Sequence, residues 1–356
     1  MKKSIRFGCR IFLAAGEPFQ AIVDRAKLCE SLGFDSVLID DHLLYGTGDA
    51  AAPEPFTTMA VVAAKTRRIR VGVAVTDLVR RHPAILAQTA ATLSSEFSGR
   101  TFLGLGAGDP MNQAPFGMLS DHRYGMLREG LEVMRLLWGS SVTDSQSFSG
   151  EFFQLKNAYL QTGVKEADIP PLYLAAFGPR MLDLAGRAAD GWIPHCHTPT
   201  TYTSDLQVIR ESARKAGRTL TELSPAYYTL CSVSSKREQA NHDILGPAKY
   251  FLALIPEALR KIDPHASHPG RIWEKMSHPR EQRETIRKIA AEIPENDAYN
   301  TVIHGTSRDC VEQIEAYRKS GYIEFMLTFV DSGGLWASES LSSQAQFFAK
   351  NVMSKY

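Results

Sequence analysis

The stretch Thr101-Phe-Leu-Gly-Leu-Gly-Ala-Gly-Asp-Pro-Met-Asn112 decides the fold, because an apolar run closes in three alternating glycines and continues directly into polar residues. A short apolar run bounded by Gly and Pro predicts a buried strand followed by a loop. Glycine lacks a Cβ, so main-chain amides of this loop can approach a bound molecule, and Asp109 and Asn112 add a carboxyl and an amide. A surface turn explains the same glycines equally well.

Similar apolar runs alternate with helical patterns along the chain, which predicts repeated β-α units on a parallel sheet. The eight predicted strands span residues 5–11, 36–39, 69–75, 101–105, 172–175, 191–193, 226–233 and 324–329. The helices predicted between and after them span residues 18–32, 56–64, 83–97, 122–138, 179–188, 202–216, 308–320 and 340–353. This order predicts an α/β fold, a single (β/α)8 TIM barrel over residues 1–356.

Two segments do not fit the β-α repeat. Residues 236–300 are too long for one crossover helix and carry several prolines, so they predict a helical insertion within the barrel domain. Residues 148–153 predict a small accessory hairpin with its turn at Ser149–Gly150.

Composition narrows the class of partner. The 40 Lys and Arg residues balance 39 Asp and Glu residues, so no bulk field favours nucleic acid or an anionic membrane, and we expect a small-molecule ligand. No apolar run has the length of a signal-peptide core or a membrane span, which argues for a cytoplasmic protein. Five scattered cysteines without C-x-x-C spacing suggest reduced thiols rather than disulfides or structural zinc.

Polar residues follow several of the predicted strands, at the end of a barrel where active sites form. They are Asp40-Asp41-His42, Thr76-Asp77, Asp109 with Asn112, Ala175-Ala-Phe-Gly-Pro179, and His195-Cys196-His197. Histidine titrates near neutral pH, so His42 beside a carboxylate suits acid/base chemistry, although a helix cap and a surface histidine would give the same pair. Small residues before the helix at Pro179 predict a phosphate site at a helix N-terminus.

Two further groups have competing interpretations. The His195/His197 spacing puts both imidazoles on one side of a strand, as in zinc sites. Metal-dependent hydrolase barrels carry such a pair on the first strand, which here ends Cys9-Arg-Ile-Phe12, so we predict no metal and assign one of these histidines to the substrate pocket. The run Arg80-Arg81-His82 could contact an anionic cofactor tail, but a solvated loop is slightly favoured.

Taken together, several blocks resemble the bacterial luciferase-like flavin and deazaflavin oxidoreductases, especially the branch that uses coenzyme F420. The blocks are Asp40-Asp-His42, Val75–Gln88, Ser98–Asp109, Met111-Asn112, Pro115-Phe-Gly117, Leu174–Pro179 and Ala185–Trp192. The likeness covers roughly residues 5–195 and, weakly, residues 305–329. It is greatest for members similar to the methylene-tetrahydromethanopterin reductases and the phthiodiolone ketoreductases.

The resemblance implies a homodimeric barrel with the deazaflavin ring at its mouth, over strand three, where a non-prolyl cis peptide is expected around Val73–Val75. The cofactor contacts it implies are Asp41, Val75, Thr76, Gly106, Gly108, Asn112, Ala176, Phe177 and Gly178. His42 and Asp109 become the candidate catalytic residues, while His195 and His197 are assigned to the substrate pocket.

The chain departs from the family pattern at two positions. Asp109 stands where several dehydrogenases and reductases have Glu, so this carboxyl is one methylene shorter and direct protonation of substrate by it is in doubt. Gly46 replaces an aromatic residue of the sugar-phosphate dehydrogenases, which argues against that substrate.

The predicted function is hydride transfer between deazaflavin C5 and a small or moderately apolar substrate: reduction of a carbonyl, C=C or C=N bond, or the reverse oxidation of an alcohol. His42 or Asp109 would be the proton partner. The alternatives are an FMN-dependent monooxygenase of the same superfamily, a metal-dependent hydrolase that uses His195 and His197, and a cofactor-binding barrel without catalysis.

Overall fold

The computed structural model describes residues 5–45, 50–219, 223–270, 272, 279–331 and 338–356. Eight parallel strands close into a barrel. They are β1 (Ile5–Arg10), β3 (Ser36–Ile39), β5 (Arg70–Asp77), β6 (Thr101–Gly106), β9 (Leu172–Leu174), β10 (Gly191–Trp192), β11 (Ser224–Val233) and β13 (Ile323–Phe329). The predicted fold class is confirmed.

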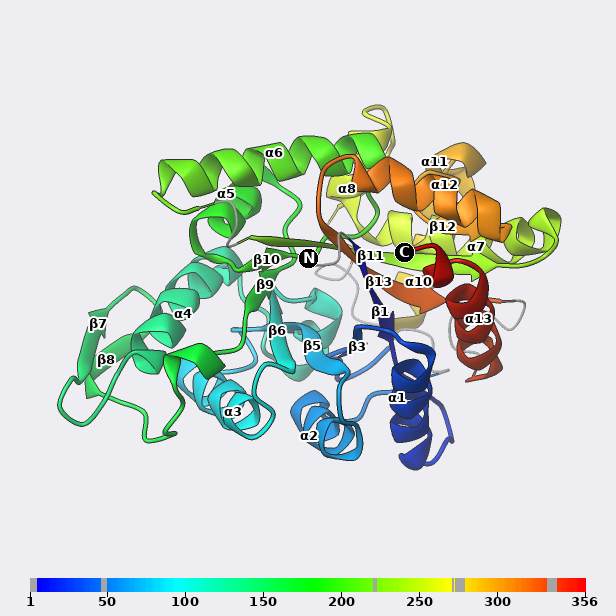
Figure 1. Ribbon diagram of the computed structural model, residues 1–356. Coiled ribbons are helices and arrows are strands. Elements are labelled where there is room, and N and C mark those ends of the chain that lie inside the picture. The colour runs from blue at the N-terminus through cyan, green and yellow to red at the C-terminus, as the bar shows by residue number, and fades with distance from the viewer. Residues whose placement is uncertain (1–4, 46–49, 220–222, 271, 273–278, 332–337) are drawn as a thin grey trace.

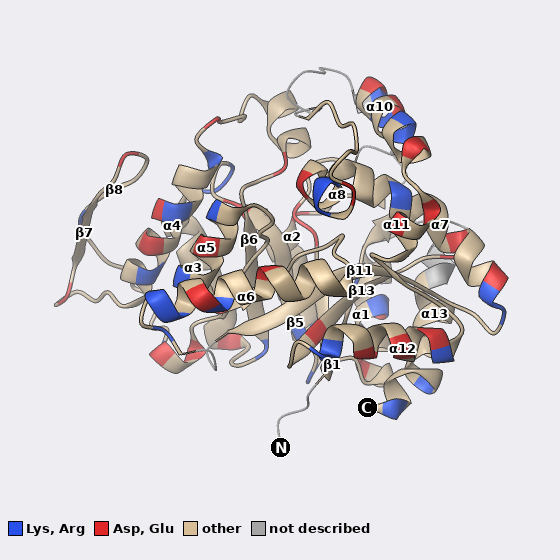
Figure 2. Ribbon diagram, turned by 90° about the horizontal axis from the view of Figure 1, so that it is seen from above, with Lys and Arg blue, Asp and Glu red and all other residues tan. Residues whose placement is uncertain are grey.

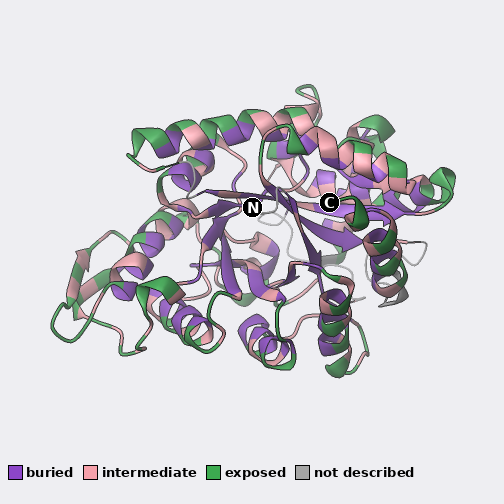
Figure 3. Ribbon diagram, in the orientation of Figure 1, coloured by how far each residue is buried: buried purple, intermediate pink, exposed green. Residues whose placement is uncertain are grey.

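Two parallel pairings close the sheet. The first strand pairs with the last, with Phe7 opposite Phe325, and β10 pairs with β11, with Trp192 opposite Pro225. All eight carboxyl ends therefore meet at one rim, so residues far apart in sequence can share a site. The strands occupy the centre of Figure 1 and are buried, whereas the outer faces of the helices are exposed in Figure 3.

The outer ring consists of helices that the sequence predicts to within about three residues. They are α1 (Gln20–Leu32), α2 (Pro55–Lys65), α3 (Pro83–Glu96), α4 (Arg123–Trp138), α5 (Pro179–Ala188), α6 (Pro199–Lys215), α12 (Ser307–Arg318) and α13 (Ser338–Asn351). Local chemistry fixes their starts: Pro83 begins α3 while the His82 ring accepts the Ala84 N–H at 3.2 Å, and Thr198 forms a capping box with Thr201.

The segment predicted as an insertion is mainly helical in its described part, with residues 263–270 forming turns and loop; residues 271 and 273–278 lie outside the described residues. Its elements are α7 (Arg237–Leu254), α8 (Pro256–Ile262), α10 (Pro279–Glu292) and α11 (Glu295–Tyr299), followed by the short strand β12 (Ile303–Gly305), which pairs with β11. Apolar residues such as Ile244, Leu252 and Ile286 form a second core, against which Phe177 and Leu230 of the barrel pack. The insertion therefore covers the rim beside the loop between β9 and α5.

The accessory hairpin exists but is longer than predicted. Its strands are β7 (Gln146–Ser149) and β8 (Gln154–Ala158), so the turn occupies residues 150–153 rather than Ser149–Gly150 alone. The reason is Glu129 of α4, which is 4% exposed and whose carboxylate accepts the main-chain N–H groups of Glu151, Phe152 and Phe153.

The amino end of the barrel, which we call the floor, contains a buried ion pair. Arg70 donates to Glu324 at 2.9 Å, and Ser36 donates to the other oxygen of the same carboxylate at 2.6 Å. Arg70 also reaches the Tyr173 hydroxyl at 3.5 Å. All four residues lie at or near the start of their strands, so the network links four strands on the side opposite the rim.

The remaining short elements are β2 (Leu13–Ala14), β4 (Ala50–Ala51), η1 (Pro110–Asn112), η2 (Ala114–Phe116), η3 (Glu166–Asp168) and η5 (Met353–Lys355). Among the described residues, no helix combines the length and apolarity that crossing a membrane requires. Figure 2 shows both signs of charge interspersed on the surrounding helices.

Candidate active site

Asp41, the first predicted site carboxylate, lies at the rim directly after β3 and is 3% exposed. Its oxygens accept from Arg80 at 3.0 Å and from Arg81 at 3.1 Å. Burial alone would raise the pKa of Asp41, but the two guanidinium groups outweigh it and hold that pKa below its usual value. Asp41 therefore stays ionised inside a salt-bridge network, and its contact with a cofactor stays a prediction.

Arg80 corrects the interpretation of residues 80–82 as a solvated loop. Its side chain is 7% exposed and bridges Asp41 and Asp77, with 2.5 Å between Arg80 Nε and Asp77 Oδ2. Arg81, at 28% exposed, adds a contact to Glu54. The charge run was misread because Asp41, which binds both arginines, follows the neighbouring strand and comes close only when β3 and β5 pair; Asp77 is the local partner of Arg80, three residues earlier.

Thr76 and Val75 lie at the end of β5, beside Asp41. Thr76 is fully buried. The peptide bond between Ala74 and Val75 is cis, as the resemblance predicted for this position, and the register with β6 shifts between Val73 and Thr76. This irregularity gives the end of β5 a different backbone course from its neighbours.

The glycines of the defining stretch serve close packing within the protein. A Cβ on Gly104 would lie 2.9 Å from Val75, and one on Gly106 would lie 3.1 Å from the same side chain. Gly108 has a φ of +88°, and its Cβ would lie 2.0 Å from Gln113. The missing Cβ atoms leave room for the side chains of Val75 and Gln113. Any contact of Gly106 or Gly108 with a cofactor would therefore be through main-chain atoms.

Asn112, which is 1% exposed, connects the loop after β6 to the loop after β3. Its Oδ1 accepts the main-chain N–H groups of Leu43 at 2.7 Å and Leu44 at 3.1 Å. The amino group of Asn112 is therefore the donor to His42 Nδ1, at 2.9 Å. The Leu44 carbonyl oxygen lies farther from His42 Nδ1, at 3.3 Å, so the shorter Asn112 contact assigns Nδ1 as the acceptor. In that tautomer the ring hydrogen is on Nε2, which has no hydrogen-bond partner among the described residues.

Asp109, the second candidate catalytic residue, caps the short helix η1. Its Oδ1 accepts the N–H of Met111 at 2.9 Å, and Asn112 is the last residue of that helix. Asp109 thus helps to orient the loop that carries Asn112. Asn112 therefore connects the two candidate catalytic residues. It binds His42 directly, and it lies in the short helix that Asp109 caps.

The predicted phosphate loop leads into α5. Ala176 is buried, and Gly178 is the N-cap, with no atom within 4 Å of the place where its Cβ would lie. The N–H groups of the first turn of a helix have no partners within the helix, so this end can receive an anion. The carbonyl oxygen of Phe177 accepts from Lys261 of α8 at 2.7 Å, which attaches the insertion to this loop.

His197 is packed inside the protein. It is 1% exposed, its Nδ1 lies 2.9 Å from the carbonyl oxygen of His195, and its Nε2 lies 2.9 Å from Asp205 of α6. Lys261 binds the same carboxylate oxygen. Burial alone would raise the pKa of Asp205, but the hydrogen bonds from His197 and Lys261 lower it, so Asp205 stays ionised.

His195 lines a pocket between the rim and the insertion. Its ring contacts Phe177, Tyr228 and Phe251, with centroids 5.2, 5.8 and 6.1 Å away. Burial, with the neighbouring His197, lowers the pKa of His195 to about 3, so the ring is neutral at physiological pH.

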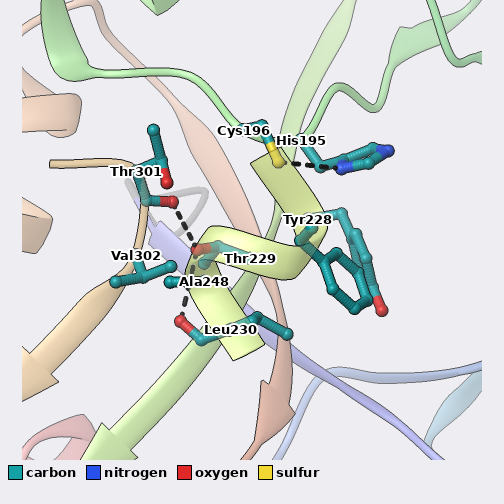
Figure 4. A pocket seen from close by; sticks show the side chains of 9 residues that line it. His195, Cys196, Tyr228, Thr229, Leu230, Ala248, Thr301 and Val302 are labelled. Atoms are coloured by element: carbon teal, nitrogen blue, oxygen red, sulfur yellow. Dashed lines mark hydrogen bonds between the residues drawn. The ribbon is translucent and has the colours of Figure 1, made fainter. Parts of the chain in front are cut away.

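Nine residues line this pocket, and Figure 4 shows eight of them labelled around a coiled part of β11. They are His195, Cys196, Tyr228, Thr229, Leu230, Ala248, Phe251, Thr301 and Val302. Thr229 closes one side by donating to the carbonyl oxygens of Leu230 and Thr301. None of the nine is Asp, Glu, Lys or Arg. Within the described part of the chain, no three His, Cys, Asp or Glu residues gather as a metal site.

Comparison with known proteins identifies the family. The family model described as luciferase-like monooxygenase matches residues 5–324. The chain belongs to the luciferase-like monooxygenase family. The resemblance drawn from the sequence is thereby confirmed, and luciferase-like proteins supply the relatives with which the site can be compared.

Two luciferase-like relatives are similar over most of the chain. An F420-dependent glucose-6-phosphate dehydrogenase of Nakamurella multipartita is 33% identical, over 89% of this chain and 88% of that protein. A phthiodiolone/phenolphthiodiolone dimycocerosates ketoreductase of Mycobacterium sp. strain JLS is 31% identical, over 75% of this chain and 72% of that protein. The solved structure of an F420-dependent secondary alcohol dehydrogenase with an F420-acetone adduct has a TM-score of 0.80 at 24% identity, covers both chains completely, and supports the fold.

Sequence reasoning missed Lys261 and Asp205 as parts of the site. Lys261 lies in a segment whose helical pattern carried no site signal, and Asp205 faces inward from the middle of α6. The pattern of α6 offered one signal, since Asp205 falls on the buried face of that helix with Leu206 and Ile209. An acidic residue on a buried face needs a partner. Gly46 lies outside the described residues.

Proposed function

We propose that this luciferase-like chain is a coenzyme F420-dependent oxidoreductase acting on an uncharged, small or moderately apolar carbonyl, alkene, imine or alcohol. The observation that carries the proposal is His42, held at the rim by Asn112 with its Nε2 hydrogen unpaired among the described residues. The name of the relative at 33% identity supports the cofactor, and the name of the ketoreductase at 31% identity supports carbonyl chemistry.

The residues present fit such a cofactor. The open first turn of α5 at Gly178 suits the phosphate of the cofactor tail, and the cis-peptide end of β5 at Val75 offers a surface for the ring. When bound, the reduced deazaflavin supplies a hydride from C5. Asp41 and Thr76, which line the same rim, complete the proposed cofactor contacts together with Gly106, Gly108, Asn112, Ala176 and Phe177.

In the proposed mechanism, His42 donates a hydrogen bond from Nε2–H to the substrate oxygen while Asn112 keeps Nδ1 as the acceptor. In this tautomer the ring stabilises the alkoxide that forms as the hydride is delivered, and the alkoxide takes its proton from solvent. Asp109 is assigned to orienting the η1 loop, because its carboxylate already caps that helix. We assign His195, whose ring contacts Phe177, Tyr228 and Phe251, to the substrate side of the site.

The sequence argues against a sugar phosphate, because Gly46 stands where the sugar-phosphate dehydrogenases of the family carry an aromatic residue. We therefore infer that the substrate class lies nearer to the ketones and secondary alcohols. The cytoplasmic location and the homodimer stay predictions.

The first experiment is binding of oxidised F420 and of FMN, measured separately by fluorescence polarisation with the purified protein. We expect F420 to bind with an affinity at least tenfold higher than that of FMN. Oxidation of reduced F420 by a panel of ketones then identifies the acceptor. Preferential FMN binding would contradict the proposal and support the monooxygenase alternative. The hydrolase alternative requires a free His197, whose two nitrogens are bonded inside the protein.

A further inference from the structure

The Tyr45 ring stacks on the imidazole of His42. The two centroids are 4.5 Å apart, and the rings are inclined by 18°. Asn112 contacts His42 at its Nδ1 edge, whereas Tyr45 covers a face. A hydrogen bond at one edge restricts the plane of the ring only weakly, because the χ2 torsion of histidine is broad. A ring stacked on its face restricts that torsion further.

Tyr45 is itself anchored. Its hydroxyl donates to Asp40 Oδ2 at 3.0 Å. Burial raises the pKa of Tyr45 well above its usual value, and the charge of Asp40 raises it further, so the hydroxyl stays protonated and remains a donor. Asp40 directly follows β3, and it thereby connects the tyrosine in the loop to a strand end.

Asp40 is held in turn by Arg10, the last residue of β1. Arg10 Nε donates to Asp40 Oδ2 at 2.7 Å, and Arg10 Nη2 binds the same oxygen. Arg10 is 3% exposed, and its guanidinium lies 5.2 Å from the Phe12 ring centroid. Burial alone would raise the pKa of Asp40, but Arg10 keeps that pKa below its usual value.

We propose that Tyr45, anchored through Asp40 and Arg10, is a positioning residue that fixes the plane of the His42 ring. The inference rests on the proposed function, because Tyr45 is assigned to orienting the Nε2–H with which His42 donates to the substrate. Two barrel strands carry the anchor, so the direction of this hydrogen is set by the barrel rather than by the loop. Asn112 sets which nitrogen carries the hydrogen, and Tyr45 sets where it points.

The first test needs neither cofactor nor substrate. The protein has ten histidines, so His42 is assigned in ¹⁵N-histidine-labelled protein by the resonance lost in His42→Asn. We expect the wild-type His42 shifts to report a hydrogen on Nε2. Tyr45→Leu should broaden them and shift them, because the ring loses its stacked neighbour and becomes mobile while Asn112 still sets the tautomer, and Tyr45→Phe, which keeps the stack, should change them less. Unchanged shifts and line widths in Tyr45→Leu would overturn the proposal.

The second test measures oxidation of reduced F420 with the best ketone of the panel. We expect Tyr45→Leu to lower kcat roughly 10²-fold and Tyr45→Phe about tenfold, with KM and the F420 Kd changing less than about threefold. In a His42→Asn background, Tyr45→Leu should have almost no further effect. Tyr159, which is 38% exposed beyond β8, provides the matched control Tyr159→Leu.

The proposed function and the positioning role of Tyr45 can be disproved separately. If the wild type binds no F420, the proposed function is wrong, while the resonance test still decides whether Tyr45 orders His42. If Tyr45→Leu weakens F420 binding as much as it lowers kcat, or acts equally in the His42→Asn background, Tyr45 does not act through His42.

Discussion

The barrel has a buried arginine–carboxylate pair at each end, and the two pairs differ in what they hold. At the floor, Arg70 and Glu324 join Ser36 and Tyr173, all of which lie on strands. At the rim, Arg10 and Asp40 hold Tyr45, whose loop carries the candidate catalytic histidine. The two pairs are therefore alike in charge and burial. They differ in the tyrosine that each contacts, which is Tyr173 on a strand at the floor and Tyr45 beside His42 at the rim.

The largest effect is expected from breaking the floor pair. Glu324→Leu leaves Arg70 buried without its carboxylate, which should lower the free energy of unfolding by roughly 3–5 kcal/mol. Urea unfolding measures this loss. The double variant Arg70→Met/Glu324→Leu should recover part of it, because the uncompensated charge is gone, and the folded fraction should keep its F420 affinity. A larger loss of F420 affinity than of stability would contradict the division between floor and rim.

Acid should act on the rim through His195. Its pKa is lowered to about 3 in the folded state, against about 6.5 unfolded, so between these values the unfolded state binds more protons. Stability therefore falls as pH drops from about 6.5 toward 3, by about 1.4 kcal/mol for each pH unit.

His195→Phe should remove this part of the slope. Chemical unfolding at several pH values between about 4 and 7 compares the two proteins. His304, whose pKa burial lowers to about 4, gives both proteins a common background. Equal slopes in wild type and variant would show that His195 is protonated alike in the folded and unfolded states.

Lys261→Met tests the attachment of the insertion to the phosphate loop. Without the ammonium group, the Phe177 carbonyl and Asp205 lose their shared donor, so the loop is less well fixed. We expect the F420 Kd to rise about tenfold, which corresponds to about 1.4 kcal/mol. Lys288→Met, at an exposed position of α10, is the matched control. Equal Kd values for the two variants would mean that the attachment does not support cofactor binding.

The smallest effect is expected at the floor from Ser36→Ala. The carboxylate of Glu324 loses one hydrogen bond but keeps Arg70, so the free energy of unfolding should fall by roughly 1 kcal/mol. Thermal unfolding measures it, with F420 affinity as the second readout. A change in F420 affinity at constant stability would show that the floor communicates with the rim.

Most of the fold could be predicted because its signals are local. The apolar runs and helix periods that define the strands depend on residues two to four apart, and all eight strands lie within two or three residues of their predicted bounds. The hairpin was less well predicted, because Glu129, from a helix some twenty residues earlier, sets its turn.

The sequence predicted where the site residues lie, but not which of them contact one another. The sequence indicated that His42, Asp109 and Asn112 follow strands and would share the rim. It could not indicate that Asn112 binds His42, 70 residues away, or that Arg80 is buried between two carboxylates. Partners of buried charges depend on which strand ends meet, and this is settled only when the barrel closes.

The sequence by itself therefore determined the order of strands and helices, the family and the rim positions, since these follow from periodicity and from short motifs. The tertiary structure alone decided which residues each of two similar ion pairs contacts. Arg10 reaches Asp40 across 30 residues, and Ser36 reaches Glu324 across 288. Parallel pairing of the strands brings the partners of each contact together. Local sequence patterns extend over only a few residues and therefore do not indicate contacts between residues so far apart in the chain.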